Sequence, residues 1–299
     1  PGNDPSTMLS GWTIKTCTLI KKYQANQSSA RLSRSHKMTH GEKMKKLLHY
    51  CWLGPRDLPN KEATCIETWK EVLPDYQLKL WNEQSFDLVS NSFAAQAYKN
   101  SAYAFASDYA RTRALYDHGG LYLDTDVEIL EGFREIANIN KCFLGFETRS
   151  KIGTAVMCFT PQHPVIKEFL DFYERNDFVD ERGNFNTIAN VSILTDILTT
   201  RGLKADGTRQ KIDGIEIFPR EFFYPKKISD QQFRITEDTA AVHKCSNSWM
   251  TERERVRGKN PLWINIMRPL LRGLKNTGKR FLGEDLIQEI EVQVRNKLK

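Results

Sequence analysis

The chain has 299 residues, of which 40% are hydrophobic and 27% charged, with a net charge of +7. A chain of this length and composition can bury a substantial core, which excludes a disordered protein and favours one large domain with or without appendages. No apolar run approaches the length of a membrane span, so we expect neither a membrane anchor nor a signal peptide. The six cysteines are scattered without a Cys-X-X-Cys pair, which favours reduced thiols in a cytosolic protein over structural zinc.

The charge is concentrated at the two ends of the chain. Residues 1–46 hold nine Lys/Arg against two Asp/Glu, and residues 253–299 hold twelve against five. Residues 47–252 hold 23 against 30 and are therefore mildly acidic. Nucleic-acid binding usually needs a basic stripe on the folded body, so we expect no nucleic-acid partner. Basic ends fit attraction to an anionic membrane surface.

Three regions follow from these patterns. Residues 1–43 are polar and aperiodic, as in a flexible extension that is either native or artificial. Residues 44–252 contain the strand and helix patterns of a globular domain. Residues 253–299 form a basic tail, in which apolar residues recur at helical spacing over 261–282. Such a helix either lies in a membrane interface or packs on the domain.

The globular region alternates strands and helices. Leu47–Leu53 is a short apolar run closed by Gly54 and Pro55, which predicts a buried strand and a turn. Strands are also predicted at Tyr76–Trp81, Leu121–Val127, Cys142–Phe146, Ala155–Phe159 and Ile215–Phe218. Helices are predicted at Lys61–Val72, Ser92–Tyr98, Ala102–His118, Pro164–Tyr173 and Ile188–Thr200. This alternation predicts an α/β fold with a mostly parallel sheet that is covered on both faces.

Two aspartates follow the most apolar of these strands. Asp124 and Asp126 come after Leu121–Leu123, and Gly119 suits the end of the preceding helix. In a strand, Tyr122, Asp124 and Asp126 would share one face. Neighbouring carboxylates repel unless a cation separates them, and a divalent metal held by few carboxylates keeps positions for phosphate oxygens. The pattern therefore indicates a metal–diphosphate site of an enzyme that uses nucleotide-sugars.

An isolated Asp-X-Asp is weak support by itself, because many copies are solvated turns. The context favours a site, since carboxylates at the carboxyl end of a buried strand lie where open α/β sheets bind ligands. Asp108 and Arg111 are three residues apart on the preceding helix and share a face, which by itself is equally typical of a surface ion pair.

Several neighbouring motifs resemble those of glycosyltransferase family 32, the sugar transferases with an Asp-X-Asp motif. The most specific block runs from Ala106–Arg111 through Gly119–Asp126. The resemblance spans Lys46 to Trp249, and its shorter parts are Lys46–Gly54, Cys65–Lys70, Leu73–Tyr76, Leu80–Glu83, Phe223–Pro225, Val242–His243 and Ser248–Trp249. One departure is Lys244–Cys245, where the family often has a second histidine or an aromatic residue.

The resemblance implies a GT-A fold, meaning a nucleotide-binding α/β sandwich that uses Mn²⁺ or Mg²⁺. It also implies transfer of a sugar from a nucleotide-sugar with retention of anomeric configuration. For the bacterial members it implies synthesis of capsule or lipopolysaccharide on the cytoplasmic face of the membrane, with a lipid-linked oligosaccharide as the acceptor. We therefore expect a cytoplasmic or peripheral membrane enzyme, with the basic tail as the docking element.

The resemblance also implies roles for individual residues. Asp126 would ligate the metal directly, Asp124 would bind it through water or contact the ribose, and His243 would be a third ligand. Asp108 would accept hydrogen bonds from the donor sugar, and Arg111 would neutralise charge on the leaving diphosphate. The remaining donor-binding candidates are Tyr50, Trp52, Ser107, Tyr122, Ser248 and Trp249.

Three alternatives stay open at this level. The donor is either a UDP-linked hexose or N-acetylhexosamine, which we favour, or GDP-mannose. The chain could instead be a catalytically silent sugar-nucleotide-binding protein, although an intact acid pair argues against that. A metal-dependent phosphohydrolase or nuclease would need clustered His and Asp ligands, which six dispersed histidines do not supply. No carboxylate is identifiable as a covalent nucleophile, so we expect attack on the same face as the leaving phosphate, which takes the acceptor proton.

Overall fold

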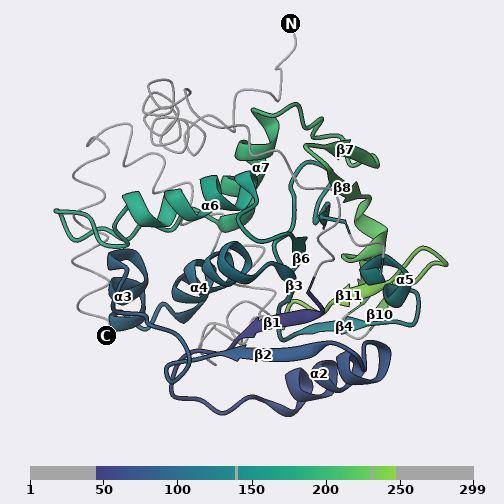
Figure 1. The fold of residues 1–299 in the computed structure, drawn as a ribbon, viewed down its shortest axis with the longest axis horizontal. Helices are drawn as coiled ribbons and strands as arrows, with labels where there is room; N and C mark the ends of the chain where they lie inside the picture. Colours follow the sequence, from purple (N-terminus) through teal and green to yellow (C-terminus); the bar gives the residue numbers. More distant parts are fainter. Residues whose placement is uncertain (1–44, 139–140, 230–231, 247–299) are drawn as a thin grey trace, which may run out of the picture.

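A computed structural model describes residues 45–138, 141–229 and 232–246 of the chain (Figure 1). The predicted extension at 1–43, the basic tail at 253–299, Ser248 and Trp249 lie outside these residues. The proposed boundaries at 43 and 252 therefore stay predictions. Within the described residues, no helix is both long enough and apolar enough to cross a bilayer. The five cysteines among them are all free thiols.

The first half of the described chain follows the predicted order. It contains β1 (Leu47–Cys51), α2 (Asn60–Val72), β2 (Gln77–Trp81), α3 (Ser92–Lys99), α4 (Tyr103–His118) and β3 (Gly120–Leu123). Gly119 ends α4 with a positive φ of 64°, as its position predicted. A side chain there would also meet the backbone nitrogen of Pro161 at 2.5 Å, so only glycine fits this tight connection from α4 into β3.

The second half holds short elements that the sequence pattern did not distinguish from loops. The predicted elements appear as β5 (Phe143–Gly145), β6 (Val156–Phe159), α6 (Pro164–Arg175), α7 (Asn190–Thr199) and β8 (Ile215–Phe218). The additional ones are β4 (Val127–Ile129), α5 (Phe133–Asn138), β7 (Gln210–Ile212), η2 (Arg220–Phe222), β9 (Lys227–Ser229), β10 (Gln232–Phe233) and β11 (Ala241–His243). None of these exceeds six residues, which is too short for a periodic pattern to show.

The central sheet has seven strands in the order β2-β1-β3-β6-β5-β8-β7. The strands β2, β1, β3, β5 and β8 run in one direction, whereas β6 and β7 run in the other. This confirms a mostly parallel sheet. Because β6 lies antiparallel between β3 and β5, the residues that precede β6 meet those that follow β3 and β5 at one edge of the sheet.

Both faces of this sheet are buried, as predicted. One face packs against α3, α4, α6 and α7 in a core that includes Phe93, Leu115, Phe169 and Leu194. The other face packs against α2, α5 and the two-stranded β4–β11 sheet (Figure 1). The alternation along β3 assigns Tyr122 to the first core, and Leu121 and Leu123 to the second.

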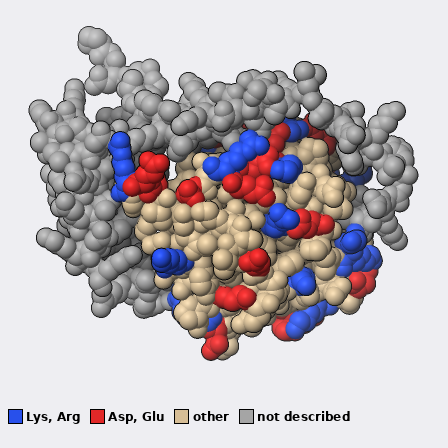
Figure 2. Space-filling model, turned by 60° about the vertical axis from the view of Figure 1, so that its left-hand side comes forward, with Lys and Arg blue, Asp and Glu red and all other residues tan. Residues whose placement is uncertain are grey.

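Charges on the outer surfaces of α4 and α6 are arranged in ion pairs. Arg113, Lys167 and Arg175 contact Asp117, Asp171 and Glu174. Figure 2 shows Lys and Arg interspersed with Asp and Glu over the described part of one face. Pairs as exposed as these contribute little stability, and their alternation leaves no large field of one sign on the described part of this face.

Candidate metal centre and its cavity

The ends of several strands surround one cavity of about 420 Å³. The cavity is lined by residues that follow β1, β3 and β5, by the two residues before β6, and by the N-terminal parts of α4 and α7. This is the carboxyl edge of the parallel strands, where α/β sheets bind ligands. Of the sequence-predicted site residues, it is lined by Trp52, Ser107, Asp108, Arg111, Tyr122, Asp124, Asp126 and His243.

The Asp-X-Asp segment is a turn that directly follows the end of β3. β3 ends at Leu123, and the Val127 amide donates to the Asp124 carbonyl at 3.0 Å to close a tight turn before β4. The predicted continuous strand Leu121–Val127 is therefore wrong at its centre. The backbone reverses because β4 pairs with β11 in a separate sheet, where Val127 lies opposite His243. The turn and this pairing, not strand alternation, bring the carboxylates together.

Asp124, Asp126 and His243 form a set of possible metal ligands. One side-chain donor atom from each lies within 4.8 Å of the other two. The His243 Nε2 atom is 3.3 Å from Asp126 Oδ1, and the Ser246 amide donates to Asp126 Oδ2 at 2.7 Å. Two carboxylates and an imidazole suit Mn²⁺ or Mg²⁺, since oxygen-rich sets with one nitrogen accommodate these ions. The residues present therefore fit a divalent metal.

Asp126 and His243 each change the pKa of the other. Burial opposes the charge on the His243 ring, but the Asp126 carboxylate and Cys245 outweigh it and raise the pKa of His243 well above its ordinary value. Burial also opposes charge on Asp126, whereas hydrogen bonds from His243 and the Ser246 amide lower the pKa of that carboxyl. The contact between Asp126 and His243 therefore favours the charged form of each group.

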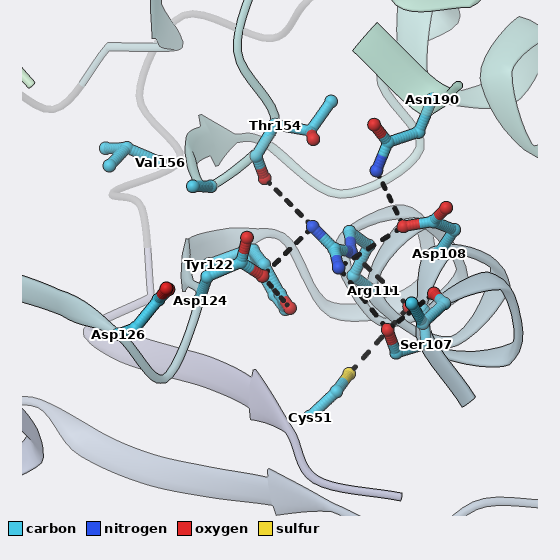
Figure 3. Close-up of polar contacts among 12 residues, drawn as sticks. Cys51, Ser107, Asp108, Arg111, Tyr122, Asp124, Asp126, Thr154, Val156 and Asn190 are labelled. Carbon is cyan, nitrogen blue, oxygen red and sulfur yellow. Dashed lines mark hydrogen bonds and ion pairs between the residues drawn. The ribbon is translucent and has the colours of Figure 1, made fainter. Parts of the chain in front are cut away.

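Arg111 connects Asp124 to α4 (Figure 3). Its guanidinium lies 3.0 Å from Asp124 and 3.2 Å from Asp108, with its side chain 7% exposed. It also donates to the Thr154 carbonyl at 3.3 Å. The alternative of a solvated surface ion pair is thus wrong for Asp108 and Arg111, because both are buried. Arg111 lines the cavity, but two carboxylates already occupy its guanidinium, so the arrangement fits a residue that holds Asp124 in place.

Asp108 is held from the opposite side by Asn190. The Asn190 amide donates to Asp108 Oδ1 at 2.6 Å, and its own oxygen accepts from the amide of Val191 in the first turn of α7. Burial raises the pKa of Asp108 to about 6, with Asp124 adding to the effect and Arg111 opposing it. Asn190 is a site residue that sequence reasoning missed, because a lone asparagine in a loop-to-helix segment carries no motif.

Ser107 and Tyr122 support the same network. The Tyr122 hydroxyl donates to Asp124 Oδ1 at 2.8 Å, and the Arg111 guanidinium lies 4.8 Å from the centre of the Tyr122 ring. Ser107 Oγ donates to the Ala104 carbonyl and accepts from Arg111 at 3.4 Å. Tyr122 is 1% exposed, so its principal role in the structure is to orient the Asp124 carboxylate.

The two aromatic candidates at the end of β1, Tyr50 and Trp52, lie in different environments. Trp52 follows the strand, is half-buried, and lines the cavity with its indole N–H donating to the Arg56 carbonyl at 2.7 Å. Tyr50 does not line the cavity. It packs edge-on against Trp69 of α2 at 5.6 Å, in the core on the other face of the sheet. The structure therefore brings Trp52 but not Tyr50 to the site. The two residues would share a face in a continuous strand, but β1 ends at Cys51, so strand alternation no longer fixes the direction of the Trp52 side chain.

Tyr224 and Glu147 were also missed. The Tyr224 hydroxyl accepts hydrogen bonds from the amides of Ala155 and Val156, both at 3.1 Å, and its ring contacts His243 edge-on at 5.7 Å. Glu147 lines the cavity after β5. The Phe223–Pro225 motif gave a signal near Tyr224, but nothing in the sequence marked Glu147.

Comparisons with known proteins find similar sequences around this motif. Residues 59–143 match a family described as a glycosyltransferase sugar-binding region containing a DXD motif. The chain is 21% identical over 215 residues to an uncharacterized glycosyltransferase of Acanthamoeba polyphaga mimivirus, covering 68% of this chain and 82% of that protein. It is 28% identical over 150 residues to a lactosylceramide 4-alpha-galactosyltransferase of Pongo pygmaeus, covering 46% of this chain and 65% of the relative.

Two solved structures are also similar. The PaToxG glycosyltransferase matches with 20% identity and a TM-score of 0.44, covering 62% of this chain and 77% of that one. An active-site mutant of LgtC matches with 12% identity and a TM-score of 0.34, covering 67% and 87%.

The predicted α/β fold class with a mostly parallel central sheet is confirmed. The family match includes Asp124 and Asp126, the pair that the turn after β3 places beside His243. Over its DXD-containing region, the chain is therefore similar to glycosyltransferases.

Proposed function

We propose that this chain transfers a hexose or N-acetylhexosamine from a UDP-linked donor to a saccharide acceptor, with Mn²⁺ or Mg²⁺ and with retention of anomeric configuration. One observation carries the proposal: the donor atoms of Asp124, Asp126 and His243 lie within 4.8 Å of one another at a cavity of about 420 Å³. A cavity of this size suits a small ligand.

The metal-binding part of the proposal assigns Asp126 and His243 as direct ligands and Asp124 as their partner. When bound, the ion would supply positive charge to the diphosphate of the donor. Arg111 and Tyr122 already hold Asp124 from two sides, so its carboxylate needs little reorientation on binding.

Recognition of the transferred sugar is assigned to Asp108. Its carboxylate lines the cavity and is fixed by Arg111 and Asn190, which leaves acceptor capacity for sugar hydroxyls. Trp52 lines the same cavity and is the proposed stacking surface for the base. The proposed reaction is same-face attack, in which the acceptor oxygen bonds to the anomeric carbon, the bond to the leaving phosphate breaks, and that phosphate takes the acceptor proton.

The biological setting is also part of the proposal. The acceptor is an oligosaccharide, lipid-linked in surface polysaccharide synthesis, at the inner face of the cytoplasmic membrane. The support for membrane docking is that Lys and Arg outnumber Asp and Glu in residues 253–299, and such a positive charge is attracted to an anionic membrane surface. Binding of the full chain to vesicles with and without anionic lipid, at low and high salt, tests this part separately.

The test of the activity is hydrolysis and transfer by the full chain with UDP-hexoses, UDP-N-acetylhexosamines and GDP-mannose, with Mn²⁺ or with a chelator. We expect metal-dependent turnover of a UDP-sugar, and Asp126→Asn should lower it at least about 100-fold because a direct ligand is lost. Asp238→Asn, at an exposed turn away from the cavity, is the matched control. Full activity of Asp126→Asn would refute the metal assignment. Turnover of GDP-mannose alone would show that the donor is GDP-mannose and not a UDP-sugar. Binding of a nucleotide-sugar without turnover would indicate a catalytically silent binding protein.

A further inference from the structure

Glu147 is an acidic side chain in the cavity that the proposed function does not use. It follows β5 at the edge of the sheet where Asp124 follows β3, and both side chains line the cavity. Its carboxylate is close enough to Asp124 and His243 for each to change its pKa. Glu147 therefore shares the space in which the proposed donor would bind.

The backbone around Glu147 is firmly held. Phe146 is fully buried, donates to the Phe218 carbonyl at 2.9 Å and bridges to Ile152. The Glu147 amide donates to the Lys151 carbonyl at 2.9 Å, which closes a short hairpin. The position of the side chain is therefore set by two regular pairings and not by a free loop.

The Glu147 carboxylate lacks a partner within the protein. In the part of the chain that the structure describes, no group donates a hydrogen bond to it and no Lys or Arg forms an ion pair with it, although the side chain is only half-exposed. Burial raises its pKa, Asp124 adds to that effect, and His243 and Arg220 oppose it. A partly buried carboxylate without donors is unfavourable unless a ligand supplies them.

We propose that the Glu147 carboxylate accepts a hydrogen bond from a hydroxyl group of the transferred sugar; this inference rests on the proposed function. An ionised carboxylate only accepts hydrogen bonds, so its ligand must offer donors. A sugar offers hydroxyls, whereas the diphosphate is an anion that the carboxylate repels.

Two further observations restrict what the Glu147 carboxylate would contact. Glu147 does not belong to the group of donor atoms within 4.8 Å that Asp124, Asp126 and His243 form, so it is not a fourth ligand of that group among the described residues. Asp124, His243 and Arg220 are the charged groups that shift its pKa. We expect a sugar attached to a diphosphate at Asp124 and His243 to lie within reach of Glu147, because all three side chains line the same cavity.

The experiment compares Glu147→Met, Glu147→Gln and wild type in the full chain with Mn²⁺. Met keeps the length of the side chain and removes the acceptor oxygens, while Gln keeps one. The probes are UDP alone and UDP-galactose, or whichever nucleotide-sugar of the panel above wild type hydrolyses. Glu135→Met, at an exposed position of α5, is the matched control.

We expect Glu147→Met to lower kcat/KM for donor hydrolysis by about 10- to 100-fold, because a hydrogen bond to a charged group is lost. Glu147→Gln should lose less, and the Kd for UDP with Mn²⁺ should stay within about twofold in all variants, as expected when only the sugar contact changes. Unchanged hydrolysis by Glu147→Met would overturn the inference, as would an equal loss of UDP binding, which would indicate a structural role. A wild-type chain that neither binds nor hydrolyses any nucleotide-sugar would instead refute the proposed function.

Discussion

Asp108 makes the stability of this protein depend on pH in an unusual direction. Its carboxyl is buried between Arg111 and Asn190, and burial raises its pKa from 3.8 to about 6. The folded state therefore binds a proton more tightly than the unfolded state does. The stability that this proton contributes is fully present below pH 3.8 and is lost as the pH rises through about 6.

The magnitude follows from the size of the shift. Each pKa unit corresponds to about 1.4 kcal/mol, so ionising Asp108 in the folded protein costs about 3 kcal/mol at neutral pH. Asp108→Asn removes the ionisation and keeps an oxygen that can accept from Asn190. Relative to wild type, the variant should gain about 3 kcal/mol in free energy of unfolding between pH 4 and pH 7.

The assay is urea denaturation of the metal-free protein at several pH values, followed by tryptophan fluorescence. The difference between variant and wild type removes the contribution of titrating groups that lie far from Asp108. Asp238→Asn, at an exposed turn, is the matched control. A flat difference for Asp108→Asn, or one that favours wild type as the pH rises, would refute the reasoning.

Two other predictions concern residues that hold the sheet and the site together. His49 is fully buried, with Nε2 bonded to the Gly119 carbonyl and Nδ1 accepting from Trp81, and burial lowers its pKa from 6.5 to about 4. Because the folded state binds a proton at His49 less tightly than the unfolded state does, the free energy of unfolding should fall by about 3 kcal/mol as the pH falls from 6.5 to 4. In the same denaturation series, His49→Gln should show a smaller loss of stability over this pH range. Tyr224→Phe leaves the amides of Ala155 and Val156 without their acceptor and should lower the free energy of unfolding by about 1–3 kcal/mol. The control is Tyr173→Phe, whose buried hydroxyl has no hydrogen-bond partner among the described residues and whose removal should cost nothing; equal losses in both variants would contradict the prediction.

Part of the site could be predicted because the relevant residues are local in sequence. Asp108 and Arg111 lie within one turn of a helix whose pattern is strong, and Asp124 follows a short apolar strand directly. Helical spacing and strand length are properties of the chain itself, so they appear without knowledge of the neighbours. The long helices and the buried strands were predicted to within a few residues for the same reason.

The sequence by itself determined the α/β class, the motif and the approximate place of the acid pair. Only the tertiary structure decided that the pair lies in a turn, that His243 reaches it across the β4–β11 ladder, that Tyr50 faces the other core, and that Asn190 and Glu147 join the cavity. These contacts connect residues that lie far apart in the chain, and β4 and β11 have only three residues each. Such short segments have weak intrinsic preferences, so pairing and packing with distant partners fix where their side chains point.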